Sequence, residues 1–324
     1  MNEILIGVHD LKVHFPIKRG LFSRTTGYVY AVDGISFDLA KGETLGIVGE
    51  SGCGKTTAGL AVTRLIPATG GSVTWKGRLM AGMRRDELRA LRRQVQLIFQ
   101  DPYASLDPRM TVNQILADPM DVHGLYAGPA RRDRLAFLLE TVGLSAEQGR
   151  RYPHEFSGGQ RQRIGIARAL ALDPSVIIGD EPVSALDVSI QAQAINLLMD
   201  LKADFDLSLI IISHDLAVVA NICDRIIVMY LGRIVESAAY RDLYGNPRHP
   251  YTRALLSAVP VPDPLRKKKR IVLKGDVPSP THPPSGCRFH TRCPSRMAIC
   301  ERQMPELIDV GEGHMAACHL ERDP

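Results

Sequence analysis

The sequence predicts an α/β fold with a mostly parallel central sheet, a helical insertion and a small cysteine-rich C-terminal extension. Three observations support this prediction. Short apolar runs rich in isoleucine and valine recur along the chain, helical patterns separate them, and the residues after 246 are rich in proline and cysteine. Continuous apolar runs of strand length suit parallel strands buried on both faces. Their alternation with helices indicates a layered α/β core over residues 1–245.

Four apolar runs are the expected core strands: Thr44–Gly49, Ser175–Asp180, Ser208–Ser213 and Arg225–Tyr230. The stretch from about 101 to 156 differs, because it carries several prolines and has helical patterns near Val112–Leu116 and Arg134–Val142. We expect a small helical subdomain there. Since proline and cysteine become frequent after Asn246, we expect a second, smaller unit over residues 246–324.

The composition is that of an ordinary globular protein, with 45% hydrophobic and 23% charged residues. No apolar run approaches the roughly 20 residues that span a bilayer, and no secretory signal is visible, so we expect a cytoplasmic location. The net charge of +5 equals the five positive charges of the run 266–270. The rest is balanced, which argues against a nucleic-acid surface. The run itself is expected to be a solvated linker; contact with phosphate or anionic lipid is the alternative.

The stretch "GESGCGKTT" has the spacing G-x-x-x-x-G-K-[ST] between an apolar strand and an expected helix. Its residues are Gly49, Glu50, Ser51, Gly52, Cys53, Gly54, Lys55, Thr56 and Thr57. Glycines let successive backbone N–H groups turn toward phosphate oxygens. We expect Lys55 to neutralise the β- and γ-phosphates of a nucleotide, Thr56 to ligate Mg²⁺ and Thr57 to contact a phosphate.

Polar residues follow two of the expected strands. Asp180 and Glu181 end the run "SVIIGDEP", and His214 follows "SLIIIS". Parallel strands deliver such residues to one sheet edge, so we expect all three near the γ-phosphate. Asp180 would hold Mg²⁺, Glu181 would act as general base toward water, and His214 would sense the γ-phosphate and orient that water.

A second anion site is expected where "FSGGQRQRIGIARAL" begins a helix that runs toward Asp173. Ser157 is its expected cap, and the helix start offers free N–H groups. With "LIFQDPYASLDP", "IIGDEPVSALD" and "IIISHD", the ordered motifs resemble those of the ATP-binding cassette (ABC) ATPase family over about three quarters of the chain. Phe156 stands where the family usually has leucine.

The resemblance implies an ABC-type fold with an antiparallel β part and a role for each motif. Gln100 would reach Mg²⁺ and the attacking water and link the site to a transmembrane partner. Ser157, Gly158, Gly159 and Gln160 would be the signature loop, and residues 184–187, ending at Asp187, the loop at the dimer interface. Two protomers would then sandwich ATP head to tail, which explains why one chain carries two anion sites. An aromatic ring would stack on adenine; the candidates are Phe15, which is favoured, Tyr28 and Tyr30.

The stretch "NPRHPYTRALLSAVPVPDP" and the cysteine-rich end resemble the ATP-binding subunits of bacterial oligopeptide and dipeptide importers. This resemblance implies a second, similar ATPase subunit in a heterodimer, two membrane permeases, an extracytoplasmic solute-binding protein and a peripheral place on the cytoplasmic side of the inner membrane. Related importers of nickel, glutathione or murein peptide share these features. A soluble ABC ATPase acting on nucleic acid or ribosomes and an exporter motor are the competing hypotheses.

Four clustered cysteines, Cys287, Cys293, Cys300 and Cys318, are the remaining chemical signal. Four thiolates suit either tetrahedral Zn²⁺ or an iron–sulfur cluster, and the spacing has no C-x₂-C pair to decide between them. The importer resemblance implies a [4Fe–4S] cluster. A zinc site and free thiols stay open as alternatives.

Overall fold

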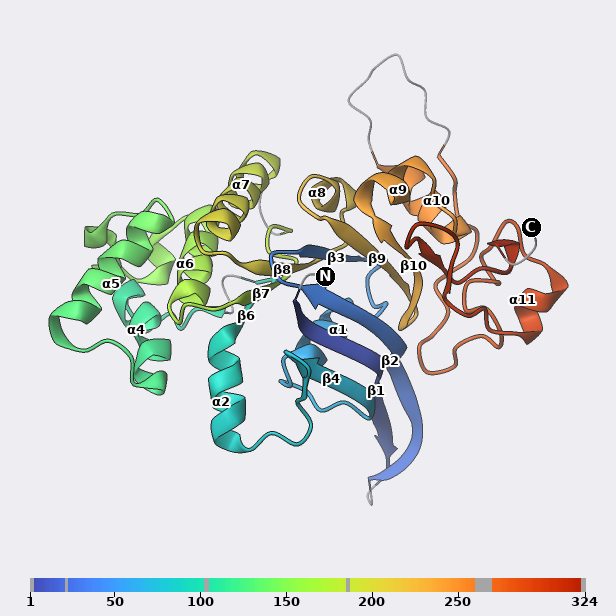
Figure 1. The fold of residues 1–324 in the computed structure, drawn as a ribbon, viewed down its shortest axis with the longest axis horizontal. Helices are drawn as coiled ribbons and strands as arrows, with labels where there is room; N and C mark the ends of the chain where they lie inside the picture. Colours follow the sequence, from blue (N-terminus) through green and yellow to red (C-terminus); the bar gives the residue numbers. More distant parts are fainter. Residues whose placement is uncertain (1–2, 21–22, 102–104, 185–186, 260–269, 322–324) are drawn as a thin grey trace, which may run out of the picture. The chain divides into compact units, whose positions relative to one another are not determined.

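The computed structural model of the chain describes residues 3–20, 23–101, 105–184, 187–259 and 270–321. The chain divides into two compact units (Figure 1). The first contains residues 1–82 and 212–324, and the second contains residues 83–211. The first unit therefore combines both ends of the sequence.

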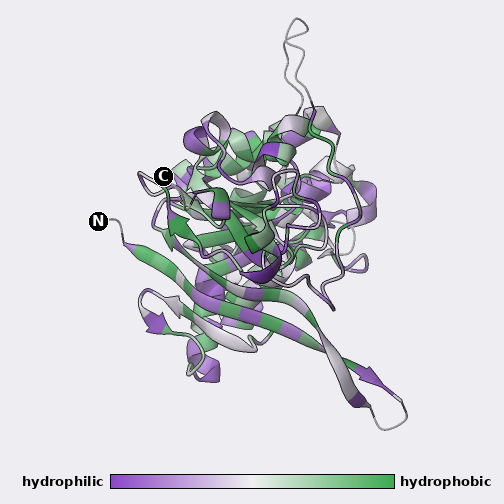
Figure 2. Cartoon of the chain, turned by 90° about the vertical axis from the view of Figure 1, so that its right-hand side faces the viewer, coloured by the Kyte–Doolittle hydropathy of each residue, from purple (hydrophilic) through white to green (hydrophobic). Residues whose placement is uncertain are grey.

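An antiparallel sheet opens the first unit, with strand order β2-β1-β4-β5. Its strands are β1 (Ile4–Arg19), β2 (Arg24–Ala40), β4 (Gly70–Trp75) and β5 (Arg78–Leu79). The β1–β2 pair is a long ribbon whose exposed end is hydrophilic (Figure 2). The expected antiparallel part is thereby confirmed.

The first unit also holds the strands β11-β12-β10-β9-β3, in this order. They are β3 (Thr44–Val48), β9 (Arg225–Tyr230), β10 (Arg233–Ala239), β11 (Ile308–Asp309) and β12 (Met315–Ala316). β3 and β9 pair in parallel, as their apolar runs predict. The C-terminal segment adds antiparallel strands to them, because Glu236 pairs with Ala316 and Ser237 with Met315. The tail is thus built onto the sheet that carries the phosphate loop.

The helices of the first unit are α1 (Lys55–Val62), α8 (Leu216–Ala220), α9 (Tyr240–Gly245), α10 (Pro250–Ala258), α11 (Ala298–Arg302) and the 3₁₀ turn η3 (His319–Glu321). The second unit contains the strands β8-β7-β6. They are β6 (Val95–Ile98), β7 (Val176–Asp180) and β8 (Ser208–Ser213), whose last two residues belong to the first unit. β6 and β7 are parallel. All four predicted core strands are therefore present.

The helices of the second unit are α2 (Arg85–Gln94), α4 (Val112–His123), α5 (Gly128–Thr141), α6 (Gly158–Leu170) and α7 (Val188–Asp204), with 3₁₀ turns η1 (Ala146–Arg150) and η2 (Pro153–Glu155). α4 continues through Pro119 beyond its predicted end. Ile115, Leu116 and Met120 bury one face on both sides of the proline, which offsets the loss of one N–H donor. α6 ends at Leu170, slightly before the predicted Asp173.

The division into units differs from the predicted domain limits. The second unit is longer than the helical subdomain expected over 101–156, and residues 246–324 belong to the same unit as the N-terminal strands. The boundary near residue 245 stays a prediction. Within the described residues, no helix has the length and apolar character to cross a membrane.

Candidate nucleotide-binding site

The loop between β3 and α1 has the backbone of a phosphate cradle. β3 is buried along its whole length and ends directly before Gly49. Gly49 has φ +155°, and a Cβ there would lie 2.2 Å from the carbonyl oxygen of Met229. Gly54 has φ +103°, and a Cβ there would lie 2.0 Å from the carbonyl oxygen of Ala31. Glycine is therefore required at both ends of the loop, both for conformation and for space.

The first turn of α1 is open to an anion. Its N-cap is Gly54, which has no side chain to cap the helix. Helix N–H groups without a capping side chain, together with the positive end of the dipole, bind phosphate. Thr56 is exposed in this turn, while Lys55 is only 6% exposed. The roles of the loop residues toward a nucleotide stay a prediction.

Lys55 organises the loop from inside. Its Nζ donates to the carbonyl oxygens of Gly49 over 2.7 Å and of Glu50 over 3.0 Å. Cys53 packs beside it, and burial raises the pKa of the Cys53 thiol although the Lys55 charge acts to lower it. The thiol is therefore neutral at physiological pH and serves as packing.

The two acids at the end of β7 have different surroundings. Asp180 is buried, whereas Glu181 is partly exposed and has φ +46°, in the left-handed region. Such a conformation costs about 1–2 kcal/mol for a residue with a side chain. The N–H and Oγ of Ser184 both donate to the Glu181 carbonyl oxygen, over 3.2 and 3.1 Å. The turn that strains Glu181 is thereby fixed.

The structure places Gln100 against Glu181, a contact that the motifs did not predict. Gln100 follows β6, and its Nε2 donates to Oε2 of Glu181 over 2.8 Å. Both residues belong to the second unit. His214 is exposed directly after β8 and belongs to the first unit. The parallel strands β6 and β7 end beside one another, which explains the Gln100–Glu181 contact.

The predicted signature loop forms a capped helix start. Ser157 Oγ accepts from the N–H of Gln160, and the Ser157 N–H donates to Gln160 Oε1 over 3.1 Å, a reciprocal capping box. Ser157 is exposed, and the preceding Phe156 is 4% exposed, so it fills a core position as an aliphatic residue would. A Cβ on Gly159 would lie 2.6 Å from Ile190 of α7. The cap prediction is confirmed.

Asp187 is the exposed N-cap residue of α7 and makes no side-chain capping bond. Its neighbours Ala185 and Leu186, which complete the predicted interface loop, lie outside the described residues. So do residues 266–269 of the basic run, of which Arg270 alone is described.

Comparisons with known proteins agree with this geometry. Residues 32–184 match the ABC transporter family, and residues 235–300 match the C-terminal region of oligopeptide/dipeptide transporters. The oligopeptide transport ATP-binding protein AppF of Bacillus subtilis (strain 168) is 54% identical over 98% of this chain and 98% of its own length. The chain belongs to the ABC transporter ATPase family. A putative peptide import ATP-binding protein of Brucella ovis is 55% identical, over 97% of each chain.

Solved ABC cassettes share the fold. A dimeric cassette in a post-hydrolysis state with bound ADP and Pi aligns over 73% of this chain and 99% of its own, with 28% identity and a TM-score of 0.64. A second dimeric structure of the same cassette aligns over the same shares, also with 28% identity and with a TM-score of 0.65. The ABC ATPase fold predicted from the motifs is therefore confirmed.

The aromatic candidates of this ABC chain lie on the β1–β2 ribbon. Phe15 pairs with Val29, and Tyr28 pairs with Pro16. Directly opposed residues share a face, and successive residues alternate. Phe15 and Tyr28 therefore lie on opposite faces, and both are more than 40% exposed. Tyr30 packs edge-on against His14. The choice of the adenine-stacking ring stays a prediction.

The four tail cysteines lie in one small region. The Cys287 N–H donates to the Cys300 carbonyl oxygen over 2.8 Å, and the Met297 N–H donates to Cys300 Sγ. Burial, together with the smaller effect of the other cysteines nearby, raises the pKa of Cys287 and of Cys318 to about 11. Backbone N–H groups two residues later in the chain act on Cys287, Cys293 and Cys318 in the opposite direction.

No three histidine, cysteine or acidic side chains of the described residues gather closely enough to hold a single metal ion. The Zn²⁺ alternative therefore has no support, because a tetrahedral site needs its ligand atoms around one centre. The family descriptions and the relatives named above do not mention iron, so the comparisons give the [4Fe–4S] cluster no support, and it stays a prediction. N–H groups directed at thiol sulfurs are a feature that tunes and stabilises such clusters.

The motifs missed the residues that join the tail to the phosphate loop. Arg292 pairs with the Glu50 carboxylate, with Nη1–Oε2 at 2.6 Å and Nη2–Oε1 at 3.2 Å. The Glu50 N–H donates to Tyr251 Oη over 2.8 Å. Both contacts span more than 200 positions, and no local pattern around Glu50 could have indicated them.

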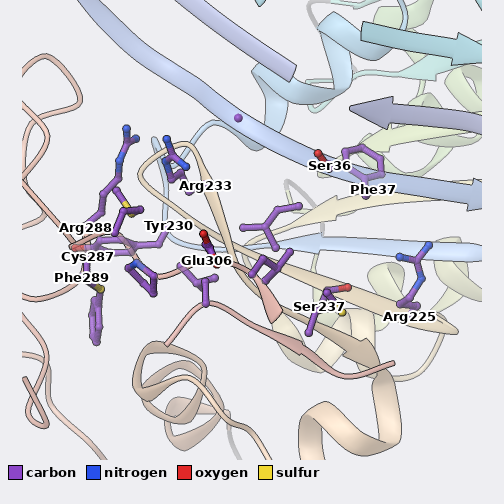
Figure 3. A pocket seen from close by; sticks show the side chains of 18 of the residues that line it. Ser36, Phe37, Arg225, Tyr230, Arg233, Ser237, Cys287, Arg288, Phe289 and Glu306 are labelled. Atoms are coloured by element: carbon purple, nitrogen blue, oxygen red, sulfur yellow. The ribbon is translucent and has the colours of Figure 1, made fainter. Parts of the chain in front are cut away.

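A second carboxylate, Asp33, also holds the tail. The Asp33 carboxylate accepts hydrogen bonds from Arg288 and, over 3.1 Å, from Arg233. It also shares a hydrogen bond of 2.9 Å with His14 Nε2. Burial acts to raise the pKa of Asp33, but the Arg288 and Arg233 charges and the hydrogen bonds from His14 and Arg233 together outweigh it and lower the pKa. Figure 3 shows Arg288 and Arg233 side by side at a cavity of about 800 Å³, one wall of which is the Cys287–Phe289 segment.

Proposed function

We propose that this chain is the ATP-hydrolysing subunit of a bacterial importer that powers uptake of di- and oligopeptides through partner permeases. The observation that carries the peptide assignment is the match of residues 235–300 to the oligopeptide/dipeptide transporter C-terminal region, in addition to the ABC match. Relatives named for peptide import align along almost the whole chain. Importers of nickel, glutathione or murein peptide are the second candidates.

In this proposal the phosphate loop binds the nucleotide. The open first turn of α1 and the loop N–H groups hold the phosphates, and the Lys55 ammonium, already aimed into the loop, neutralises them. Thr56, Gln100 and Asp180 would hold Mg²⁺, which supplies charge neutralisation at the β- and γ-phosphate oxygens when bound. The role of the protein is positioning and charge stabilisation, without a covalent intermediate.

Glu181 is the proposed general base. Its carboxylate takes a proton from the attacking water, and Gln100, which donates to that carboxylate, orients it. His214 is proposed to sense the γ-phosphate, and Asp187 to contribute at the dimer interface. The Ser157–Gln160 loop is proposed to cap the nucleotide held by a second protomer. Both structures of the related cassette are dimeric, which supports this arrangement.

Transport is tested by reconstitution. The chain would be co-purified with its permeases and its second ATPase subunit in lipid vesicles, and ATP hydrolysis would be measured with each candidate solute on the binding protein. We expect stimulation by short peptides. Stimulation by nickel or glutathione alone would move the assignment to the second candidates, and stimulation by nucleic acid without membrane partners would overturn the importer assignment.

The tail cysteines are proposed to bind a [4Fe–4S] cluster through Cys287, Cys293, Cys300 and Cys318. The backbone hydrogen bond between Cys287 and Cys300 and the backbone N–H groups that act on Cys287, Cys293 and Cys318 support this proposal. The cluster would supply a structural link in a segment with little core of its own. Protein purified without oxygen should be brown, with four iron atoms per chain expected for such a cluster. A colourless, iron-free protein that folds normally would overturn it.

We further propose that the partners are a similar but distinct ATPase subunit, two transmembrane permeases and an extracytoplasmic solute-binding protein. The chain would lie on the cytoplasmic face of the inner membrane. Quantifying the subunits in a purified complex tests the heterodimer, since a homodimeric motor would give this chain alone.

A further inference from the structure

We propose that Arg292 is a positioning residue for the nucleotide, which it serves by holding Glu50 of the phosphate loop. This inference rests on the proposed ATP-binding function. Arg292 lies in the loop between Cys287 and Cys293, here called the clasp loop (residues 287–293), far from the phosphate loop in sequence. Its side chain is 8% exposed, and that of Glu50 is 27% exposed.

Glu50 is held through each of its polar groups. Its N–H donates to Tyr251 Oη, its carbonyl oxygen accepts from Lys55 Nζ, and its carboxylate accepts two bonds from Arg292. A bidentate Arg–carboxylate pair fixes direction as well as distance. Glu50 therefore links the phosphate-binding lysine directly to the tail.

The clasp loop is itself anchored beside the phosphate loop. Phe289 is buried against Tyr230 and Tyr251, with ring centroids at 5.2 and 5.4 Å. The ring centroids of Tyr230 and Tyr251 are 4.8 Å apart, and the Arg292 guanidinium carbon lies 6.0 Å from the centroid of the Tyr230 ring. A buried aromatic cluster of this kind leaves the clasp loop little freedom to move. Arg292 is therefore presented to Glu50 by a rigid support.

Charge gives the pair a second effect. Glu50 is part of a loop that binds phosphate, and its carboxylate would repel a polyanion if it were unpaired. Arg292 neutralises that carboxylate through an ion pair with Nη1–Oε2 at 2.6 Å. Loss of Arg292 would leave the Glu50 charge partly buried and unpaired, which is the costly way to break an ion pair.

Coupling between two sites is reciprocal. If the clasp loop positions the phosphate loop, a nucleotide on the phosphate loop must also stabilise the clasp loop. A change in the cysteine-bearing tail would then change the affinity for nucleotide, and bound nucleotide would stabilise the tail of the same chain.

The test measures binding of trinitrophenyl-ATP and of MgADP to the full chain and to Arg292→Met. We expect affinity to fall about tenfold. Arg292→Lys keeps the charge without the bidentate fork and should fall in between. Arg296→Met, an exposed arginine of the same tail, is the matched control and should bind as the parent protein does.

A double-mutant cycle separates positioning from general damage. Because Arg292 acts through Glu50, the losses of nucleotide affinity from Glu50→Gln and Arg292→Met should not be additive in the double variant. Hydrogen exchange in residues 287–293 should slow on ADP binding in the parent protein but not in Glu50→Gln. Should Arg292→Met fail to fold, Glu50→Gln alone gives both readouts.

The outcomes are distinguishable from failure of the proposed function. A parent protein that binds no nucleotide contradicts the ATPase proposal. A parent protein that binds nucleotide, with Arg292→Met binding equally well, additive losses or unchanged exchange in the clasp loop, overturns the positioning role and leaves the ATPase proposal intact.

Discussion

Gln100 Nε2 lies 2.8 Å from Glu181 Oε2, so two residues 81 positions apart in the sequence share one hydrogen bond. The strands β6 and β7 that precede them are parallel neighbours, and Glu181 leaves its strand through a left-handed turn. The bond fixes the direction of the carboxylate that is the proposed base. In the proposed mechanism Glu181 is the base and Gln100 orients it, so we expect different losses of turnover when each is substituted.

Glu181→Gln should keep nucleotide binding and lower turnover by at least about 100-fold, because the amide does not accept a proton from water. ATP-bound dimers should then accumulate, since hydrolysis no longer releases them. Phosphate release and size-exclusion chromatography with ATP measure the two effects. Turnover close to that of the parent protein would show that another group is the base.

Gln100→Ala should lower turnover by about tenfold, which is less than the loss from Glu181→Gln, because orientation of the base is lost and the base itself remains. The affinity for ATP should change little. Gln96→Ala, on strand β6 itself, is the control and should leave turnover unchanged. A loss of turnover in Gln100→Ala as large as that in Glu181→Gln would contradict the orienting role of Gln100.

Gly54→Ala should abolish measurable nucleotide binding. The added methyl group would meet the Ala31 carbonyl oxygen at 2.0 Å, in a backbone conformation that alanine rarely adopts. Gly42→Ala is the control, because Gly42 has a similar positive φ of +74° but open space around an added Cβ. It should cost about 1 kcal/mol of stability with normal ATP affinity. Binding retained in Gly54→Ala would show that the loop adapts.

Ser157→Ala should lower ATPase activity in the assembled dimer without weakening nucleotide binding to a single protomer. Loss of the cap should also cost about 1 kcal/mol of stability. Thr111→Ala removes the corresponding side-chain cap of α4 in the same unit and is the matched control. If both variants lose activity in proportion to their stability loss, Ser157 has only a capping role.

His249 predicts a pH dependence of stability. Burial lowers the pKa of His249 to about 3, and its Nδ1 accepts the Tyr251 N–H. The unfolded chain binds a proton near pH 6.5 and the folded chain does not. Stability from this group is therefore full above pH 6.5 and falls as pH drops toward 3, by about 2 kcal/mol at pH 5.

Thermal unfolding of His249→Asn tests this linkage, because asparagine still caps α10 but does not titrate. The variant should lose less stability than the parent protein between pH 7 and pH 5. An identical pH dependence in the two proteins would show that the fall arises from other groups.

The sequence alone determined the core strands, the phosphate loop, the signature helix with its Ser157 cap and the family. These features are local: continuous apolar runs report burial on both faces, glycine spacing reports backbone conformation, and a capping residue reports a helix start. They could be recognised because each depends on residues only a few positions apart.

Only the tertiary structure shows which residues the cysteine-rich tail contacts. The contacts of Glu50 with Tyr251 and Arg292, and of Asp33 with Arg288, join segments more than 200 positions apart. The tail strands also pair with β10, which follows the strand beside the phosphate loop. An ion pair between distant residues leaves no periodicity in the sequence, because either partner alone is indistinguishable from an ordinary surface charge.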